Sequence, residues 1–492
     1  MSGPDLRRLA LGCLLPSFQG PTPPPWLLRS LGDGLGGVVL FASNTGDGTR
    51  LGEITDRLRT AAGRDVVIAL DEEGGEVTRL DAAHGSAVPT AAALGHLDDP
   101  ETTRAVAAWT GARLAAAGVT LDLAPVADVN SPGNPVIGLR SFGSDPELVA
   151  RHVLAAVTGL QDAGIRACVK HFPGHGDTLT DSHVGVATVA RDAASLHAVD
   201  LVPFRAAIDA GVAAVMTGHL LVPALDPVSL VTVSSVVTRD LLRGELGFAG
   251  TVVTDALEMG ALVDTAGMVG GAVGALLAGA DTLETGAVED PGAVDGIVAG
   301  VLAAVAAGRL DTADLARSAE RTAALAGPAP RSAAGAAGPV PARVRTAAER
   351  ALEVFGSPPR LTAPLVLECH SPASVAAGPT TWTFGQRLAA ELPGTTTVVL
   401  EDDRHLDVRA LAAGRPLVLV VRDVARHPWQ QRLLAQLVPR EDGVVADRAD
   451  VDGVVVVDVG WPWDPPGLPT VRTRGTAPAQ LAAAVDVLLG RG

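Results

Sequence analysis

The stretch CVKHFPGHGDTLTDSH, residues 168–183, concentrates side chains that can exchange protons or bind polar ligands. It contains three of the eleven histidines, two aspartates, and Lys170, the only lysine among 38 basic residues. Asp181 and His183 stand two positions apart, so a turn can bring the carboxylate to the imidazole. An aspartate that holds a histidine fixes its tautomer and raises its basicity, as general acid/base catalysis requires. The alternative is a solvated loop with incidental polar residues.

Carboxylates also close other apolar runs of the chain. Three of them stand at equivalent points: Asp71, Asp128 and Asp255. At such a point a carboxylate either caps the following helix or faces a common site. Together with Lys170 and two arginines, Arg79 and Arg140, these groups suit a polyhydroxylated ligand that is bound by charge-assisted hydrogen bonds.

The elements that must position these residues repeat one theme from residue 9 to about residue 286. Short apolar runs alternate with segments of helical spacing, such as Glu101–Ala117 and Pro146–Ala163. The runs are LALGCLLPSF, GVVLFA, DVVIAL, VTLDLAP, ACVKHF, AAVMTG, GTVVTD and DTLETG. Continuous apolar runs are typical of parallel strands that are buried on both faces. Eight such strands predict an α/β fold of the (β/α)8 TIM-barrel class, with a doubly wound open sheet as the alternative.

The distribution of polar residues favours the barrel. They follow many different runs, and in a barrel the carboxyl ends of all strands converge on one mouth, where the active site forms. An open sheet would concentrate them at one or two switch points.

A chain of 492 residues exceeds one ordinary core. The segment GPAPRSAAGAAGPVPAR, Gly327–Arg343, has the composition of a linker. We therefore expect a catalytic barrel domain over 1–326, a linker over 327–343 and a smaller α/β sandwich-like domain over 344–492. In the last of these, a helix is predicted over Val344–Val354, followed by strand-like runs that indicate a largely parallel sheet. Polar residues near its strand ends are Glu368, His370, Asp402 and Asp423.

Composition argues against several other classes of protein. A net charge of −17 disfavours nucleic acid and anionic membrane surfaces as partners. Three distant cysteines cannot form a disulfide framework or a cysteine zinc site. The apolar run before Cys13 is shorter than a signal-peptide core, and no run reaches the ~20 residues of a membrane span. We read LALGCLLPSF as the first barrel strand and expect a cytoplasmic protein.

Three short motifs carry little weight. GDGLGG, Gly32–Gly37, precedes a strand where a dinucleotide-binding loop would follow one. In HFPGH, Pro173 and Gly174 argue against the helix on which two histidines at this spacing would bind zinc. The chain has no G-x-S-x-G elbow, so Ser182 is not favoured as a nucleophile.

With these residues assembled, the chain resembles glycoside hydrolase family 3, in particular the two-domain form of its β-N-acetylglucosaminidase branch. The stretches that carry the resemblance run in family order through the first domain. They are GGVVLFASN (36–44), ALDEEGGEVTRL (69–80), LAPVADVN (123–130), NPVIGLRSFG (134–143), KHFPGHGDTLTDSH (170–183), VPFRAAIDAGVAAVMTGHLLVPALD (202–226) and LGFAGTVVTDALEMGAL (246–262). One position departs from the family pattern, which often has arginine after the double glycine, where this chain has Glu76.

The resemblance implies roles for particular residues. Asp255 is expected to be the catalytic nucleophile, and His183 the general acid/base, oriented by Asp181. The residues expected to bind the substrate are Asp71, Arg79, Arg140, Lys170 and His171, with Asp128 and His219 supporting the pocket. No cofactor and no metal ion are implied.

The implied activity is that of a retaining exo-β-N-acetylglucosaminidase, acting on small carbohydrates such as peptidoglycan fragments, as a monomer or weak oligomer. One alternative is a family 3 glycosidase or phosphorylase of other β-glycosides. A second is a metal-dependent barrel hydrolase with His171, His175, Asp177 and His183 as ligands. The third is a non-catalytic sugar-binding protein.

Overall fold

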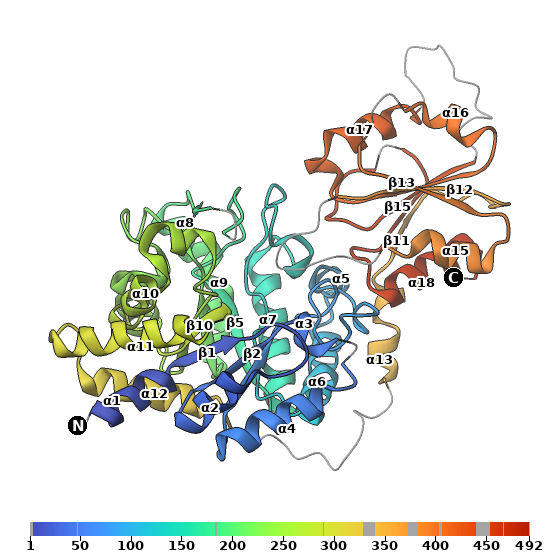
Figure 1. Ribbon diagram of the computed structural model, residues 1–492. Coiled ribbons are helices and arrows are strands. Elements are labelled where there is room, and N and C mark those ends of the chain that lie inside the picture. The colour runs from blue at the N-terminus through green and yellow to red at the C-terminus, as the bar shows by residue number, and fades with distance from the viewer. Residues whose placement is uncertain are drawn as a thin grey trace.

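The protein is described from a computed structural model (Figure 1). It describes residues 3–46, 48–182, 185–288, 290–327, 340–371, 382–402, 406–438, 453–465 and 467–491. A barrel occupies the N-terminal part of the chain, and a smaller sheet covered by helices occupies the C-terminal part. His183 lies outside the described residues.

In the described part of the chain, eight parallel strands surround the barrel axis. They are β1 (Leu14–Ser17), β2 (Gly37–Leu40), β3 (Val67–Leu70), β4 (Leu121–Asp122), β5 (Arg166–Phe172), β7 (Ala214–Thr217), β9 (Thr251–Thr254) and β10 (Leu283–Ala287). Six of them form one sheet in the order β2-β3-β4-β5-β7-β9, and β10 pairs with β1. A parallel bridge from Val253 to Thr282 joins β9 to the approach of β10, and β1 lies against β2. The predicted barrel is confirmed.

Helices cover the outside of this barrel or lie in its connections. The longer ones are α1 (Gly3–Gly12), α2 (Pro25–Asp33), α4 (Leu51–Ala62), α6 (Pro100–Ala116), α7 (Pro146–Asp162), α9 (Leu201–Asp209), the π-helix η4 (Val236–Glu245), α10 (Gly260–Ala278), α11 (Pro291–Ala306) and α12 (Thr312–Ala324). Shorter elements are α3 (Ala42–Thr45), α5 (Ala91–Leu97), η1 (Gly138–Arg140), the strand pair β6 (Ala187–Thr188) and β8 (Leu220–Leu221), α8 (Ala193–Ser195), η2 (Leu196–Asp200) and η3 (Val231–Val233).

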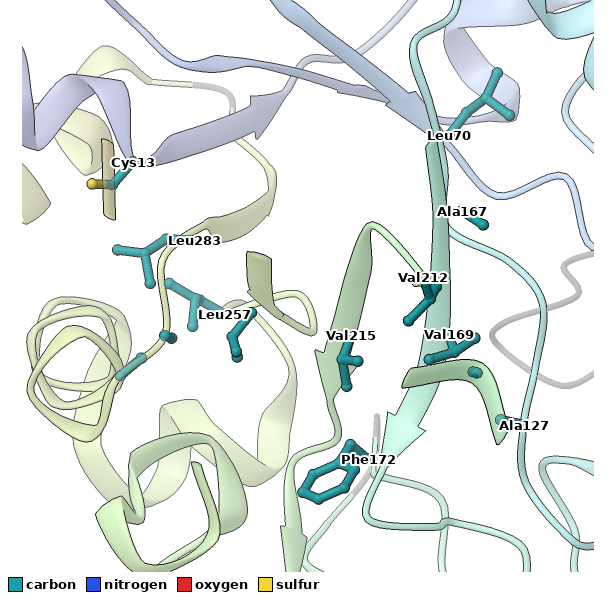
Figure 2. Packing of buried hydrophobic residues seen from close by; sticks show 14 of the residues in the cluster. Cys13, Leu70, Ala127, Ala167, Val169, Phe172, Val212, Val215, Leu257 and Leu283 are labelled. Atoms are coloured by element: carbon teal, nitrogen blue, oxygen red, sulfur yellow. The ribbon is translucent and has the colours of Figure 1, made fainter. Parts of the chain in front are cut away.

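Side chains alternate along the strands between two cores. On β5, Cys168 points into the barrel interior, where Leu15, Val39 and Met216 also lie. Its neighbours point outward into the large cluster between strands and helices, which Figure 2 shows around Val169. Strands buried on both faces explain why the sequence runs are continuously apolar.

The first predicted strand is partly wrong. Leu9 to Gly12 complete helix α1, and the strand begins only at Leu14. Ala10 and Leu11 are buried in the outer core together with Leu315 of α12. A short continuous apolar run fits a buried helix and a buried strand equally well, so the sequence pattern could not separate them.

Helix α10 is the one described helix with the length and composition of a membrane span, but it is not continuous. Gly267 has φ 66° and ψ 159°, which interrupts the helix. About 44% of its apolar window is buried inside the protein. Core helices of folded domains have the same composition, so this helix is no indication of a membrane span.

The second sheet has the order β11-β16-β15-β14-β12-β13. Its strands are β11 (Glu353–Phe355), β12 (Leu365–Cys369), β13 (Thr396–Leu400), β14 (Leu417–Val421), β15 (Val454–Asp458) and β16 (Thr470–Arg472). Helices α15 (Phe384–Glu391) and α18 (Pro478–Leu488) pack in one core of this domain, and α16 (Val408–Ala412) and α17 (Pro428–Ala435) in the other. A short 3-10 helix, η5 (Val424–Arg426), follows β14.

All strand pairs of this sheet are parallel except β11 with β16. The helix predicted over Val344–Val354 is partly wrong. Two short helices, α13 (Ala342–Arg345) and α14 (Ala347–Arg350), precede the edge strand β11. Pairing with β16, which lies more than a hundred residues away in sequence, decides this segment, and local spacing cannot show that.

Candidate active site

A cavity of about 360 Å³ opens at the carboxyl ends of the barrel strands. Residues from several strand ends reach it, since parallel strands of a barrel all end at the same mouth. Its polar lining residues are Asp71, Glu73, Arg79, Arg140, Lys170, His171, His175, Ser182, Asp255, Glu258 and Glu284. The structure thus brings Asp71, Arg79, Arg140, Lys170, His171 and Asp255 to one cavity, as the sequence predicts.

Lys170 is the centre of an ion-paired network in the wall of this cavity. Its Nζ lies 2.6 Å from Asp71 Oδ1 and 2.7 Å from Glu73 Oε1. Arg140 completes a bidentate pair with Glu73, with Nε 2.8 Å from Oε2 and Nη2 2.7 Å from Oε1. Arg79 Nη2 lies 3.5 Å from Asp71 Oδ2. The segments that follow β3 and β4 and the strand β5 therefore share one network of ion pairs.

This network favours the charged forms of Glu73 and Lys170. Burial alone would raise the pKa of Glu73, but Arg140 and Lys170 outweigh it and hold this pKa well below its usual range. For Lys170, burial lowers the pKa, yet Asp71 and Glu73 outweigh that effect and raise it. Such a network can present charged donors and acceptors to the hydroxyl groups of a polar ligand without reorganising.

Asp128 is completely buried and lies behind the cavity wall. Its Oδ2 accepts from His171 Nδ1 at 2.7 Å, and its Oδ1 accepts from the His175 backbone N–H at 2.7 Å. With Nδ1 donating, His171 Nε2 is the acceptor that faces Arg140 Nη2 at 3.5 Å. Asp128 therefore fixes the ring of His171 and the start of the following loop, without lining the cavity itself.

His175 holds that loop together. Thr178 Oγ1 lies 2.7 Å from its Nδ1, and Ser182 Oγ lies 3.1 Å from its Nε2. Burial, and then the neighbouring His171, lower the pKa of His175 to about 4, so the ring is neutral near pH 7. Both ends of the segment 178–182 are thereby tied to one imidazole.

Asp181 is half-buried in this segment, and His183 lies outside the described residues. The structure therefore describes where the predicted acid/base loop begins, from Gly176 to Ser182, and not the position of the imidazole.

Asp255 follows β9 and lines the same cavity as the ion-paired network of Lys170. Its Oδ1 accepts from the Ala256 N–H at 2.8 Å, and its own N–H donates to Thr217 O at 3.1 Å. His219 is completely buried and its Nε2 donates to Ala256 O at 2.9 Å. His219 thus holds the backbone beside Asp255 and does not line the cavity.

Glu284, in β10, is a further carboxylate in this wall. Burial, followed by the negative charges of Asp71 and Asp255, raises its pKa well above the usual range. A carboxyl group that stays neutral beside a carboxylate can donate a hydrogen bond.

The sequence interpretation gave no substrate-binding or catalytic role to five polar lining residues: Glu73, His175, Ser182, Glu258 and Glu284. The sequence signal that could have identified Glu73 is its position between Asp71 and the double glycine, and for Glu284 it is the place in the last strand. The ring contacts of His175 have no sequence signal, because Thr178 and Ser182 reach it only through the turn of the loop.

A metal centre was the rival for the histidine cluster. Among the described residues, no group of three or more His, Cys, Asp or Glu side chains is arranged to hold a metal ion. The rings of His171 and His175 are bound by protein partners, as described above.

A parallel barrel whose mouth holds a cavity lined by ion-paired side chains is typical of a barrel enzyme that acts on a polar ligand. The family described as Glycosyl hydrolase family 3 N terminal domain matches residues 31–325. The chain belongs to this family and is a glycoside hydrolase.

Known relatives agree with this assignment. The chain is 38% identical over 288 residues to a beta-hexosaminidase of Xanthomonas oryzae pv. oryzae, a match that covers 58% of this chain and 84% of the relative. It is similar to the structure of a glycoside hydrolase family 3 beta-N-acetylglucosaminidase from Paenibacillus sp. str. FPU-7, with TM-score 0.85, 32% identity and coverage of 99% and 97% of the two chains. A beta-N-acetylhexosaminidase from Beutenbergia cavernae matches with TM-score 0.60 and 32% identity, over 66% of this chain and 98% of that chain.

Proposed function

We propose that the protein is a retaining exo-β-N-acetylglucosaminidase that removes terminal β-linked N-acetylglucosamine. One observation carries the proposal: Asp255 lines the same cavity as the ion-paired network of Lys170, Glu73, Arg140 and Asp71. A carboxylate nucleophile and a set of fixed hydroxyl-binding groups around one cavity are what a retaining glycosidase needs. The activities in the names of the relatives support N-acetylglucosamine as the sugar.

In the first step, the Asp255 carboxylate attacks the anomeric carbon and the glycosidic C–O bond breaks. The leaving oxygen takes a proton from His183, which Asp181 orients in this proposal. A covalent glycosyl ester on Asp255 results.

In the second step, water attacks the same carbon from the face that the leaving group vacated. His183 takes the proton of the water, the ester bond breaks, and the Asp255 carboxylate is restored. Two displacements at one carbon retain its configuration. A histidine has an ordinary pKa of ~6.5, so it needs little tuning to act as both acid and base near neutral pH.

Water is the proposed acceptor in the second step, because the relatives at 38% and 32% identity are named as a hexosaminidase and an N-acetylglucosaminidase, which are names of hydrolases. Hydrolysis is therefore proposed over phosphorolysis.

The proposed physiological substrates are peptidoglycan fragments with a terminal N-acetylglucosamine, in the cytoplasm, with the chain acting as a monomer or weak oligomer. Apart from the small carbohydrate, the function requires no partner.

The testing experiment is NMR product analysis with the nitrophenyl glycosides of N-acetylglucosamine and glucose, with and without phosphate. We expect β-N-acetylglucosamine as the first product from the N-acetylglucosaminide, no sugar 1-phosphate, and little turnover of the glucoside. Asp255→Ala should abolish turnover of the N-acetylglucosaminide. Azide should then restore release of nitrophenol, because it replaces the lost nucleophile. Full activity of Asp255→Ala without azide would overturn the assignment.

A further inference from the structure

The second domain contacts barrel residues beside the cavity through two arginines, and the first of them is Arg422. Arg422, directly after β14, places its Nη2 2.7 Å from Glu76 Oε2 in the barrel domain. The side chains of Arg422 and Glu76 are only 12% and 6% exposed. Glu76 is the position at which the sequence departs from the pattern of its family. The negative charge of Glu76 is complementary to the positive charge of Arg422 in the second domain.

Glu76 lies at the tip of a tight turn between Glu73 and Arg79, which both belong to the ion-paired network. Gly74 N–H donates to Val77 O at 3.0 Å, and Val77 N–H donates back to Gly74 O at 3.2 Å. Glu73 precedes this turn, Val77 lines the cavity, and Arg79 follows. Any displacement of Glu76 therefore moves cavity residues on both sides of it.

A second arginine of the same segment contacts the connection between β4 and α7. Arg426 Nη1 donates to Asn134 O at 2.7 Å. The buried Asn134 side chain accepts from Val136 N–H at 2.8 Å and donates to His175 O at 2.8 Å. Val136 and His175 both line the cavity.

The two arginines are themselves fixed by the second domain. Asp423 Oδ2 lies 3.6 Å from Arg422 Nε and 3.5 Å from Arg426 Nη2. The Arg422 N–H donates to the buried Gln430 at 3.0 Å, and Asp423 Oδ1 accepts from Trp461 N–H at 2.8 Å. The segment is thus a rigid part of the second domain.

We propose that Arg422 and Arg426 are positioning residues, through which the second domain sets the geometry of the sugar-binding cavity. The kinetic part of this inference rests on the proposed function. Breaking a buried ion pair leaves an uncompensated charge, so the remaining Glu76 would pull its turn toward water. Displacing the turn misplaces Glu73 and Arg79, and errors of about 1 Å in such groups cost large factors in turnover.

The test compares Arg422→Met, Arg422→Lys and Arg426→Met with a matched control. Arg350 also bonds across the domain boundary, with Nη2 2.8 Å from Asp99 Oδ2, and neither of these two residues lines the cavity. Arg350→Met therefore removes an interdomain ion pair without touching the cavity rim. Two readouts are used: steady-state kinetics with nitrophenyl N-acetylglucosaminide, and amide hydrogen exchange of the segments 72–80 and 134–138.

We expect Arg422→Met and Arg426→Met to raise KM and the Ki of N-acetylglucosamine by about tenfold, with a smaller fall in kcat. Arg422→Met should speed amide exchange in the segment 72–80, and Arg426→Met should speed it in the segment 134–138. Arg422→Lys should restore most of the wild-type values because it keeps the positive charge. Arg350→Met should change neither readout.

Wild-type KM, Ki and exchange in the two methionine variants would overturn the proposal. So would an equal rise of KM in Arg350→Met, since that would reflect general weakening of the domain boundary. If the wild type hydrolyses no N-acetylglucosaminide, the proposed function fails. The amide exchange measurement then still decides whether the two arginines position the segments 72–80 and 134–138.

Discussion

Glu73 Oε1 lies 2.7 Å from Lys170 Nζ, although the two residues are 97 positions apart in the sequence. The same oxygen lies 2.7 Å from Arg140 Nη2. The buried Glu73 carboxylate, which follows β3, thus binds both β5, through Lys170, and the segment after β4, through Arg140. The single lysine of the chain supplies one of these two contacts.

Lys170→Arg is expected to fold and to lose sugar binding. An ammonium is a compact charge, whereas the guanidinium is a wide planar fork, and Arg140 already occupies one side of Glu73. We expect kcat/KM for nitrophenyl N-acetylglucosaminide to fall about 100-fold or more, because the ion-paired network around Glu73 must rearrange. The measurement is steady-state kinetics with circular dichroism as the fold check.

The reverse exchange Arg104→Lys, in an exposed ion pair with Asp162, is the control and should leave kinetics unchanged. Lys170→Met, which leaves Asp71 with Arg79 and Glu73 with Arg140 as their remaining cations, should in addition lower the free energy of unfolding, by less than the ~3–5 kcal/mol of a buried charge that keeps no partner. Wild-type kinetics in Lys170→Arg would make the single lysine a coincidence of composition.

Glu72 should make stability depend on pH. Burial raises its pKa to about 7 from 4.5, even though Leu80 N–H, Thr78 O–H and Arg79 N–H donate to it. Its stabilising contribution is complete below pH 4.5 and is lost as pH rises to about 7, because the unfolded chain releases the proton first. A difference of this size corresponds to up to ~3 kcal/mol.

Glu72→Gln mimics the protonated acid, since its amide can donate to the Thr78 hydroxyl and its oxygen can accept from the two backbone N–H groups. We expect the free energy of unfolding of this variant, from urea titrations at several pH values, to fall less than that of the wild type between pH 5 and 8. The exposed Glu53→Gln should follow the wild type. Parallel curves for Glu72→Gln and wild type would show that Glu72 titrates normally.

Gly176→Ala should displace the loop that leads to His183. A Cβ at this position would lie 2.0 Å from Val129 O, a backbone atom that cannot move aside. We expect a lower melting temperature and a fall in kcat of about tenfold or more, because the predicted acid/base is carried by this loop. Gly133→Ala, on the facing loop, meets only the flexible end of Leu179 at 3.6 Å and is the matched control. Equal behaviour of the two variants would refute the close approach.

The alternation of buried runs and helical segments, together with the polar residues that follow many of the runs, predicted the barrel, and the same alternation predicted the mostly parallel second sheet. The motif around Lys170 and the strand-end position of Asp255 likewise identified the polar lining of the cavity. These features are local: strand burial, loop glycines and side chains at strand ends are read from a few neighbouring residues.

Tertiary structure decided what depends on distant partners. Helix α1 replaced part of the expected first strand, and β11 replaced the end of a predicted helix, because burial and strand pairing determine those segments. Asp128 and His219 lie behind the cavity and hold its lining residues. The pairing of Glu76 with Arg422 joins residues 346 positions apart. Sequence spacing determines which chemistry a segment can supply, but only the folded chain determines which charges meet.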